Sequence, residues 1–178
     1  RAVEYIRAGD VFQVNLAHFL KGTMRGSPRE MFAALVRNAS PWYGALLELP
    51  RESGAWGGEV IASASPELFL DYDAATRRVV TRPMKGTRGG EGCAAELMGS
   101  EKDAAELNMI VDLMRNDLGR VCEYGSVRVE RGREVETHGG SATNGAAREG
   151  SGGGWGVLQG VATVSGVLRE GEGLEGVL

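Results

Sequence analysis

The longest regular pattern of apolar and polar positions runs through residues 100–122, SEKDAAELNMIVDLMRNDLGRVC. The i, i+3, i+4, i+7 spacing of one helix face is met by Glu106, Met109, Ile110 and Leu113. Ser100 is suited to cap the start of a helix, and Gly119 is suited to end it. We therefore predict one long helix whose stripe of side chains toward the core begins with a carboxylate.

The carboxylate of Glu106 needs a partner, because burying an unpaired charge is costly. Lys102 stands four residues earlier, at the spacing of a helical ion pair, which indicates a solvated carboxylate at the edge of an amphipathic helix. A bound cation is the alternative, because Asp103 lies about one turn before Glu106 on the same side of the predicted helix. The residues alone leave both interpretations open.

The rest of the chain mixes strand-like and helix-like segments. β-Branched and aromatic residues predict strands at residues 11–20, 44–50, 59–63, 68–72, 77–81 and 126–136. A short helix should end at Gly9, and a second should begin at Ser27, where Pro28 and Glu30 complete a helix-start pattern. Strands in close succession, with helices between the clusters, predict an α+β fold in which antiparallel β-sheets are backed by helices.

Composition narrows the class of protein. Hydrophobic residues make up 42% of the chain and charged residues 25%, with a net charge of −4, which is ordinary for a globular protein. No basic run indicates nucleic-acid binding, and Cys93 and Cys122 form neither a zinc motif nor a disulfide framework. No run of about 18 apolar residues predicts a membrane span, and we expect a cytoplasmic protein, or a plastid one in a plant or alga.

Residues 139–156, GGSATNGAAREGSGGGWG, differ from the rest of the chain in composition. Glycine, serine and alanine dominate the segment, which is typical of a flexible insertion that buries little apolar surface. We predict that this segment is disordered.

Several stretches resemble one enzyme family. Residues 100–120 are similar to the SEKD-x-AE-N-L-M-I-V-D-L-x-R-N-D-L-G-R stretch of chorismate-utilising enzymes, with Leu107 and Asn108 in exchanged order. These enzymes are the synthase subunits of anthranilate synthase and aminodeoxychorismate synthase, and their isochorismate-forming relatives. Residues 8–16, AGDVFQVNL, and the Ser65-Pro66-Glu67 signature also resemble family segments. The resemblance implies the N-terminal half of the sandwich fold of anthranilate synthase component I.

The resemblance implies a magnesium site on the long helix. In the family, the glutamate that matches Glu106 belongs to the Mg²⁺ site that holds the carboxylate of chorismate. Asp103 is the second candidate ligand in this chain. Mg²⁺ is commonly held by one or two carboxylates together with water and ligand oxygens, which fits this pair.

Lys85 decides between the reactions of the family. Residues 83–87 read P-M-K-G-T, whereas aminodeoxychorismate synthases have P-I-K-G-T and anthranilate synthases have P-I-A-G-T. The resemblance implies that Lys85 attacks the chorismate ring as a free amine before ammonia arrives. Gly86 and Thr87 can present backbone N–H groups to an anion, and we predict that they bind substrate. A surface lysine beside a glycine turn is the structural alternative.

Gln13 is the remaining candidate for a substrate contact. Isochorismate-forming relatives have a lysine at this position that activates water, and glutamine cannot act as a base, so we do not expect water addition. An interior strand glutamine bonded to backbone is equally compatible with the sequence. Trp42 lies in an N-x-S-P-aromatic corner that sits near a tryptophan pocket in relatives, and we expect it to pack in the core.

The family pattern is weaker after the glycine-rich segment. Residues 157–178 resemble V-x-H-L-V-S-T-V-x-G-x-L-R, which places Gln159 at the position of the catalytic histidine and Gly160 at that of a leucine. The spacing does not support His138 as a replacement. The later family segment P-G-G-S-[IV]-T-G-A-P-K does not occur in the sequence. We expect residues 1–138 to form the N-terminal half of a chorismate-binding domain and residues 157–178 to resume it as a degraded, truncated segment.

The sequence therefore predicts a fragment of aminodeoxychorismate synthase component I, inactive alone. The whole enzyme would convert chorismate into 4-amino-4-deoxychorismate, on the folate pathway, with Mg²⁺ and with ammonia from a glutamine amidotransferase subunit or fused domain. Anthranilate synthase component I is the alternative, and Lys85 argues against it. A binding-only paralogue is a further alternative, favoured by Gln159.

Overall fold

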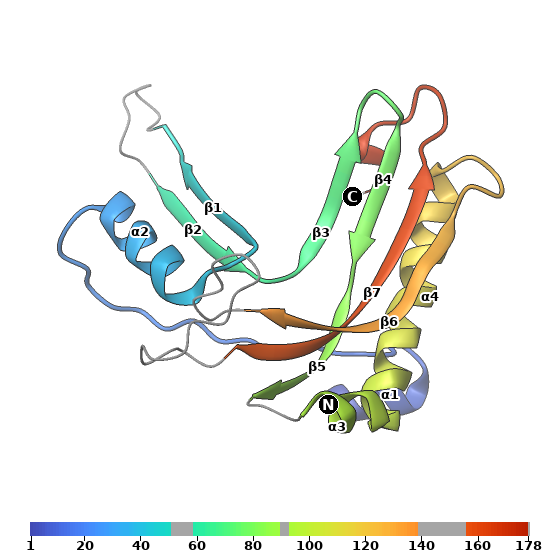
Figure 1. Ribbon diagram of the computed structural model, residues 1–178, viewed down its shortest axis with the longest axis horizontal. Helices are drawn as coiled ribbons and strands as arrows, with labels where there is room; N and C mark the ends of the chain where they lie inside the picture. Colours follow the sequence, from blue (N-terminus) through green and yellow to red (C-terminus); the bar gives the residue numbers. More distant parts are fainter. Residues whose placement is uncertain (51–58, 90–92, 139–155, 178) are drawn as a thin grey trace.

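The computed structural model describes residues 1–50, 59–89, 93–138 and 156–177. Two groups of elements are visible in Figure 1. In the first, helix α2 (Pro28–Ala39) packs on a two-stranded antiparallel sheet of β1 (Tyr43–Glu48) and β2 (Val60–Ser65). The second is a five-stranded sheet of β3 (Leu68–Asp73), β4 (Arg78–Arg82), β5 (Met84–Gly89), β6 (Arg128–His138) and β7 (Val157–Val167). Helices α3 (Ala94–Gly99) and α4 (Glu101–Val121) cover one face of this sheet. Helix α1 (Ala2–Ala8) and the short 3₁₀-helix η1 (Leu174–Gly176) complete the described elements.

Every described strand pair is antiparallel, which confirms the predicted α+β class. The predicted strands at residues 44–50, 59–63, 68–72, 77–81 and 126–136 correspond to β1, β2, β3, β4 and β6. The short helix before Gly9 and the helix that begins after Ser27 are also present. No helix of the described residues is long and apolar enough to cross a membrane.

Strand β7 is the centre of the large sheet, although it comes from the segment with the weaker family resemblance. It pairs with β4 and β5 along one edge and with β6 along the other. Ala162 and Val164 belong to the apolar core against α4, whereas Thr163 and Ser165, which alternate with them, lie on the opposite face. The two faces of the sheet therefore differ: one packs on helices, and the other carries polar side chains.

Helix α4 is where the sequence predicted it, with two corrections. Its buried stripe consists of Leu107, Val111, Leu118 and Val121, whereas Met109 is 37% exposed. The predicted stripe starts at Glu106, whereas the buried stripe starts at Leu107. Both sets of positions have helical spacing, so the spacing alone did not distinguish them. The predicted end at Gly119 is also wrong. The helix continues to Val121, since this last turn buries Leu118 and Val121 in the core.

The predicted strand at residues 11–20 is wrong. The segment is extended without forming a strand, and its apolar side chains are exposed, with Leu16, Phe19 and Leu20 at 84%, 95% and 90%. A strand requires a neighbouring strand to accept and donate its backbone hydrogen bonds, and strand propensity does not supply one. The predicted glycine-rich insertion falls almost entirely on residues 139–155, outside the described residues.

Candidate active site

Residues 83–87 form a bulged strand. The register of β5 against β7 shifts between Lys85 and Thr87, and Gly86 has a φ of 80°, in the left-handed region that favours glycine. A Cβ atom at Gly86 would lie 2.6 Å from Leu97 Cδ1 and 2.9 Å from Asp103 Oδ2. The bulge therefore presses the backbone of β5 against α3 and the first turn of α4, at a distance that only glycine allows.

The predicted site residues divide between the two faces of the sheet. Lys85 pairs with Gly160, and Thr87 pairs with Gln159. Side chains of directly opposed residues project to the same face, and Gly160 alternates with Ala162 of the helix-covered face. The register thus places Lys85 on the face that α3 and α4 cover, while Thr87 and Gln159 lie on the polar face.

Gly160 permits a second close approach. A Cβ atom at this position would lie 2.7 Å from the backbone oxygen of Lys85 and 3.5 Å from Nε of Arg133. The guanidinium of Arg133 crosses here to donate hydrogen bonds to the backbone oxygens of Leu97 and Met98. Glycine at position 160 therefore leaves room for an arginine that holds the end of α3.

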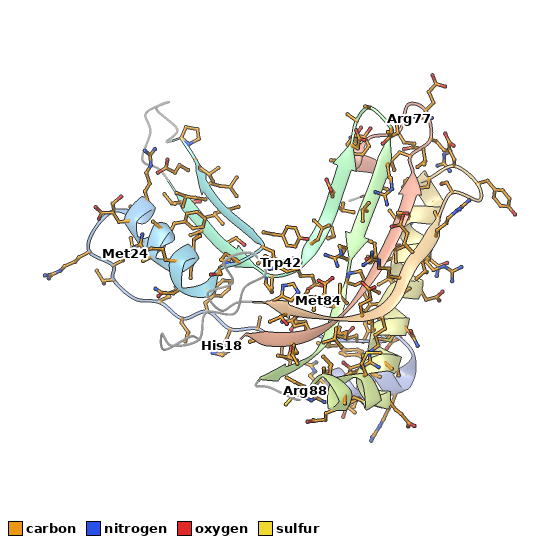
Figure 2. The ribbon with its side chains drawn as sticks, in the orientation of Figure 1. His18, Met24, Trp42, Arg77, Met84 and Arg88 are labelled. Carbon is orange, nitrogen blue, oxygen red and sulfur yellow. The ribbon has the colours of Figure 1, made fainter. Side chains whose placement is uncertain are left out.

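Asp103 is engaged within the protein. Its side chain is 13% exposed, and its Oδ2 accepts a hydrogen bond of 3.1 Å from Arg88. Arg88 also donates to Glu96 of α3 at 2.7 Å, and Figure 2 shows Arg88 beside α3. The hydroxyl of Ser100, and next the guanidinium of Arg88, hold the pKa of Asp103 below its usual value. Sequence reasoning missed Arg88, whose partners become visible only when β5 meets the helices.

Glu106 retains the ion pair that helical spacing predicted. Lys102 Nζ lies 3.8 Å from Glu106 Oε1, and the Glu106 side chain is 42% exposed. In residues 1–50, 59–89, 93–138 and 156–177 there is no group of three or more His, Cys, Asp or Glu side chains that could hold a metal. Glu106 can therefore offer one carboxylate to Mg²⁺, with the other ligands from water or substrate.

Gln13 is exposed on the extended segment between α1 and α2. It lies on no strand, so the interior-strand alternative is wrong. Its proposed contact with substrate stays a prediction.

A cavity of about 360 Å³ lies on the polar face of the large sheet, where it meets the α2–β1–β2 group. Its polar lining consists of Ser40, Trp42, Thr87, His138 and Gln159, and apolar lining comes from Ala39, Pro41, Ala64, Pro66 and Val157. Figure 2 shows Trp42 at this junction. Trp42 is 50% exposed, so the prediction that it packs in the core is wrong.

His138 is the buried polar group of this cavity. It is 4% exposed, and its ring lies 4.3 Å from that of Trp42, centroid to centroid. Nε2 lies 3.4 Å from Glu136 Oε2, and among the described residues neither ring nitrogen makes a well-formed hydrogen bond. Burial lowers the pKa of His138, and Glu136 offsets part of that shift while Arg82 adds to it.

This fold is similar to a solved structure of known class. The chain matches the crystal structure of anthranilate synthase component I from Streptococcus pneumoniae with a TM-score of 0.63 and 26% identity, over 87% of this chain and 29% of that one. The arrangement of antiparallel sheets and helices is therefore that of anthranilate synthase component I.

The sequence comparison identifies the family. Residues 1–140 match the model of the chorismate binding enzymes, and the chain belongs to this family. Anthranilate synthase component 1 of Thermus thermophilus is 39% identical over 97% of the chain, and aminodeoxychorismate synthase component 1 of Bacillus subtilis is 40% identical over 76%. The chain spans 33% and 28% of the lengths of these two relatives.

Proposed function

We propose that this chain is part of an enzyme that aminates chorismate to 4-amino-4-deoxychorismate. The observation that carries the proposal is Lys85, which immediately precedes the Gly86 bulge and shares a sheet face with α4, the helix of Glu106. Membership of the chorismate binding enzymes supports chorismate as the ligand. The ammonia would come from a glutamine amidotransferase subunit or fused domain.

In this proposal, Lys85 is the nucleophile. Its amine nitrogen uses its lone pair to form a bond to a ring carbon while the ring hydroxyl departs, and ammonia later displaces the lysine. The close contact of Gly86 with Asp103 fixes the backbone from which Lys85 projects. A fixed backbone lowers the entropic cost of bringing the Lys85 amine into the reactive geometry. A Mg²⁺ ion at Glu106 would neutralise a substrate carboxylate.

Anthranilate synthesis is the second candidate. The relative that aligns over 97% of the chain is named anthranilate synthase component 1. The two candidates differ at Lys85, since a lysine adduct belongs only to the amination that we propose.

Mass spectrometry of the full-length enzyme that contains this chain, with chorismate and without ammonia, tests the proposal. Residues 1–178 contain three lysines, Lys21, Lys85 and Lys102, so an adduct in this part of the enzyme is readily mapped. We expect an adduct on the peptide that contains Lys85, its loss in Lys85→Ala, and its retention in Lys102→Ala. An adduct distributed over all three lysines, or none on Lys85, would contradict the nucleophile assignment.

A further inference from the structure

Arg133 projects from β6 toward the helices that cover the large sheet. The register of β6 against β7 shifts between Arg131, which opposes Thr163, and Glu134, which opposes Val161. Three steps along β6 (131 to 134) thus face two along β7 (163 to 161), which is a β-bulge, and a bulge re-aims the side chains beside it. Arg131 and Glu134 pair with each other at 2.9 Å, whereas Arg133 binds α3.

The guanidinium of Arg133 binds the junction between α3 and α4. One Nη atom donates to the backbone oxygens of Met98 and Ser100, at 3.1 and 3.4 Å, and the other donates to that of Leu97. These carbonyls lie at the C-terminal end of α3, where a helix leaves carbonyl groups without partners and favours a positive charge. Ser100 is also the N-cap of α4. One side chain of β6 therefore holds the end of one helix and the start of the next.

The same arginine lies beside the backbone of Lys85. Gly160 of β7 opposes Lys85 of β5 on one side and Val135 of β6 on the other. A Cβ atom at Gly160 would lie 2.7 Å from the backbone oxygen of Lys85 and 3.5 Å from Nε of Arg133. Helix α3 packs on all three of these strands. Arg133 therefore lies next to the strand that contains Lys85 while it binds the start of the helix that contains Glu106.

This arrangement has a cost. Nε of Arg133 is buried and has no partner among the described residues, and a buried donor without a partner loses its hydration without compensation. The hydrogen bonds that Arg133 makes to described residues all go to backbone oxygens, so its planar fork fixes the position of main-chain groups. Departures of this kind from a fully satisfied interior are typical of functional sites.

We propose that Arg133 is a positioning residue, which sets the separation of the Lys85 amine and the Glu106 carboxylate by joining the α3–α4 junction to β5 and β7. The inference rests on the proposed function, in which Lys85 attacks the ring of chorismate. Glu106 lies near the start of α4 (Glu101–Val121), so a shift of the junction moves Glu106 relative to the β5 bulge. A misplacement of about 1 Å slows a reaction by on the order of 10²-fold. Arg133 acts through these two residues and not on the reacting atoms.

The rate at which the Lys85 adduct forms in the full-length enzyme, with chorismate and without ammonia, tests the inference. At saturating chorismate, Arg133→Ala should slow this rate by on the order of 10²-fold. The half-saturating concentration of chorismate should change by less than about twofold, because Arg133 acts on the reactive geometry and not on binding. Guanidinium ion at millimolar concentration should restore part of the rate in Arg133→Ala, and sodium chloride at the same concentration should not. Arg131→Ala is the matched control, since its ion pair lies within β6, and it should react at the wild-type rate.

Folding and positioning are separated in the same samples. Circular dichroism gives the folded fraction of each variant, and a rate that falls only in proportion to that fraction would overturn the positioning role. Arg133→Lys decides the matter if Arg133→Ala does not fold, because lysine keeps the positive charge but not the planar fork. We expect Arg133→Lys to fold and to form the adduct more slowly than the wild type. A wild-type rate in this variant, or its failure to fold, would also overturn the inference.

The outcomes distinguish the two proposals. A Lys85 adduct that forms equally fast in the wild type and in Arg133→Ala would overturn the positioning role and leave the proposed function standing. Absence of a Lys85 adduct in the wild type would overturn the proposed function, and the inference would fall with it.

Discussion

Gly86 and Asp103 are in such close contact that no side chain fits between them: a Cβ atom at Gly86 would lie 2.9 Å from both Cγ and Oδ2 of Asp103. The contact joins the β5 bulge to the first turn of α4. Arg88, two residues further along β5, then donates to the same carboxylate. The strand that contains Lys85 therefore packs directly on the helix that contains Glu106, through the close approach at Gly86 and the ion pair between Arg88 and Asp103.

Gly86→Ala should destabilise the chain by on the order of 2–5 kcal/mol. Alanine at a φ of 80° is strained, and its methyl group would meet Leu97 and Asp103 at 2.6 and 2.9 Å, which adds an overpacking cost. Gly89→Ala is the matched control, because it lies on the same strand with open space around it. Chemical denaturation of both variants measures the difference, and equal midpoints would contradict the close contact.

Glu106 and Asp103 should respond differently to substitution. Glu106→Gln should abolish any gain in Mg²⁺ affinity that chorismate produces, with little change in melting temperature, because Glu106 is 42% exposed. Asp103→Asn should lower the melting temperature, because it removes the acceptor of Arg88. Calorimetric Mg²⁺ titrations with and without chorismate, beside thermal melts, distinguish the two. A loss of Mg²⁺ affinity in Asp103→Asn at unchanged stability would make Asp103 a ligand after all.

The elements that sequence reasoning predicted correctly are stabilised locally. The hairpin between β3 and β4 closes where Asp73 accepts hydrogen bonds from Ala75 and Thr76, a pattern contained in four residues. Helix α4 begins where Ser100 accepts from the backbone N–H of Asp103. Such signals need no knowledge of the rest of the fold.

The predictions were wrong or incomplete where the structure of a segment depends on a partner that is distant in the sequence. Residues 11–20 have strand propensity without a described strand to pair with. The role of His138 depends on the register of β6 against β7, which are separated by the glycine-rich segment. Trp42 could be placed only once the α2–β1–β2 group met the large sheet. In each case, sequence spacing contains no information about which distant strand is adjacent.

Trp42→Ala should raise the pKa of His138. Trp42 shields one side of the imidazole, and burial is the main cause of the lowered pKa. Removing the indole lets water reach the ring, which favours the charged form. Trp42→Phe keeps a ring at this position and should retain most of the shift. NMR titration follows His138 in each variant, with His18 as the reference, and an unchanged His138 in Trp42→Ala would contradict the shielding role.

The stability of the chain should fall as the pH is lowered below about 6.5, the ordinary pKa of a histidine. The pKa of His138 is lower in the folded chain than in the unfolded chain, so the unfolded chain binds more protons in the interval between the two values. Stability therefore rises with pH across that interval and is fully present above it. The lowered carboxyl pKa values of Asp103 and Glu130 act at more acidic pH, which leaves a window directly below about pH 6.5 for His138.

Urea denaturation of wild-type chain at several pH values across this window measures the effect. His138→Gln should have a nearly flat profile, because glutamine does not titrate, whereas His18→Gln should keep the slope of the wild type. The magnitude is 1.36 kcal/mol for each pKa unit by which the folded value lies below the unfolded one. A slope in His138→Gln as steep as in the wild type would assign the pH dependence to other groups and show that folding does not lower the pKa of His138.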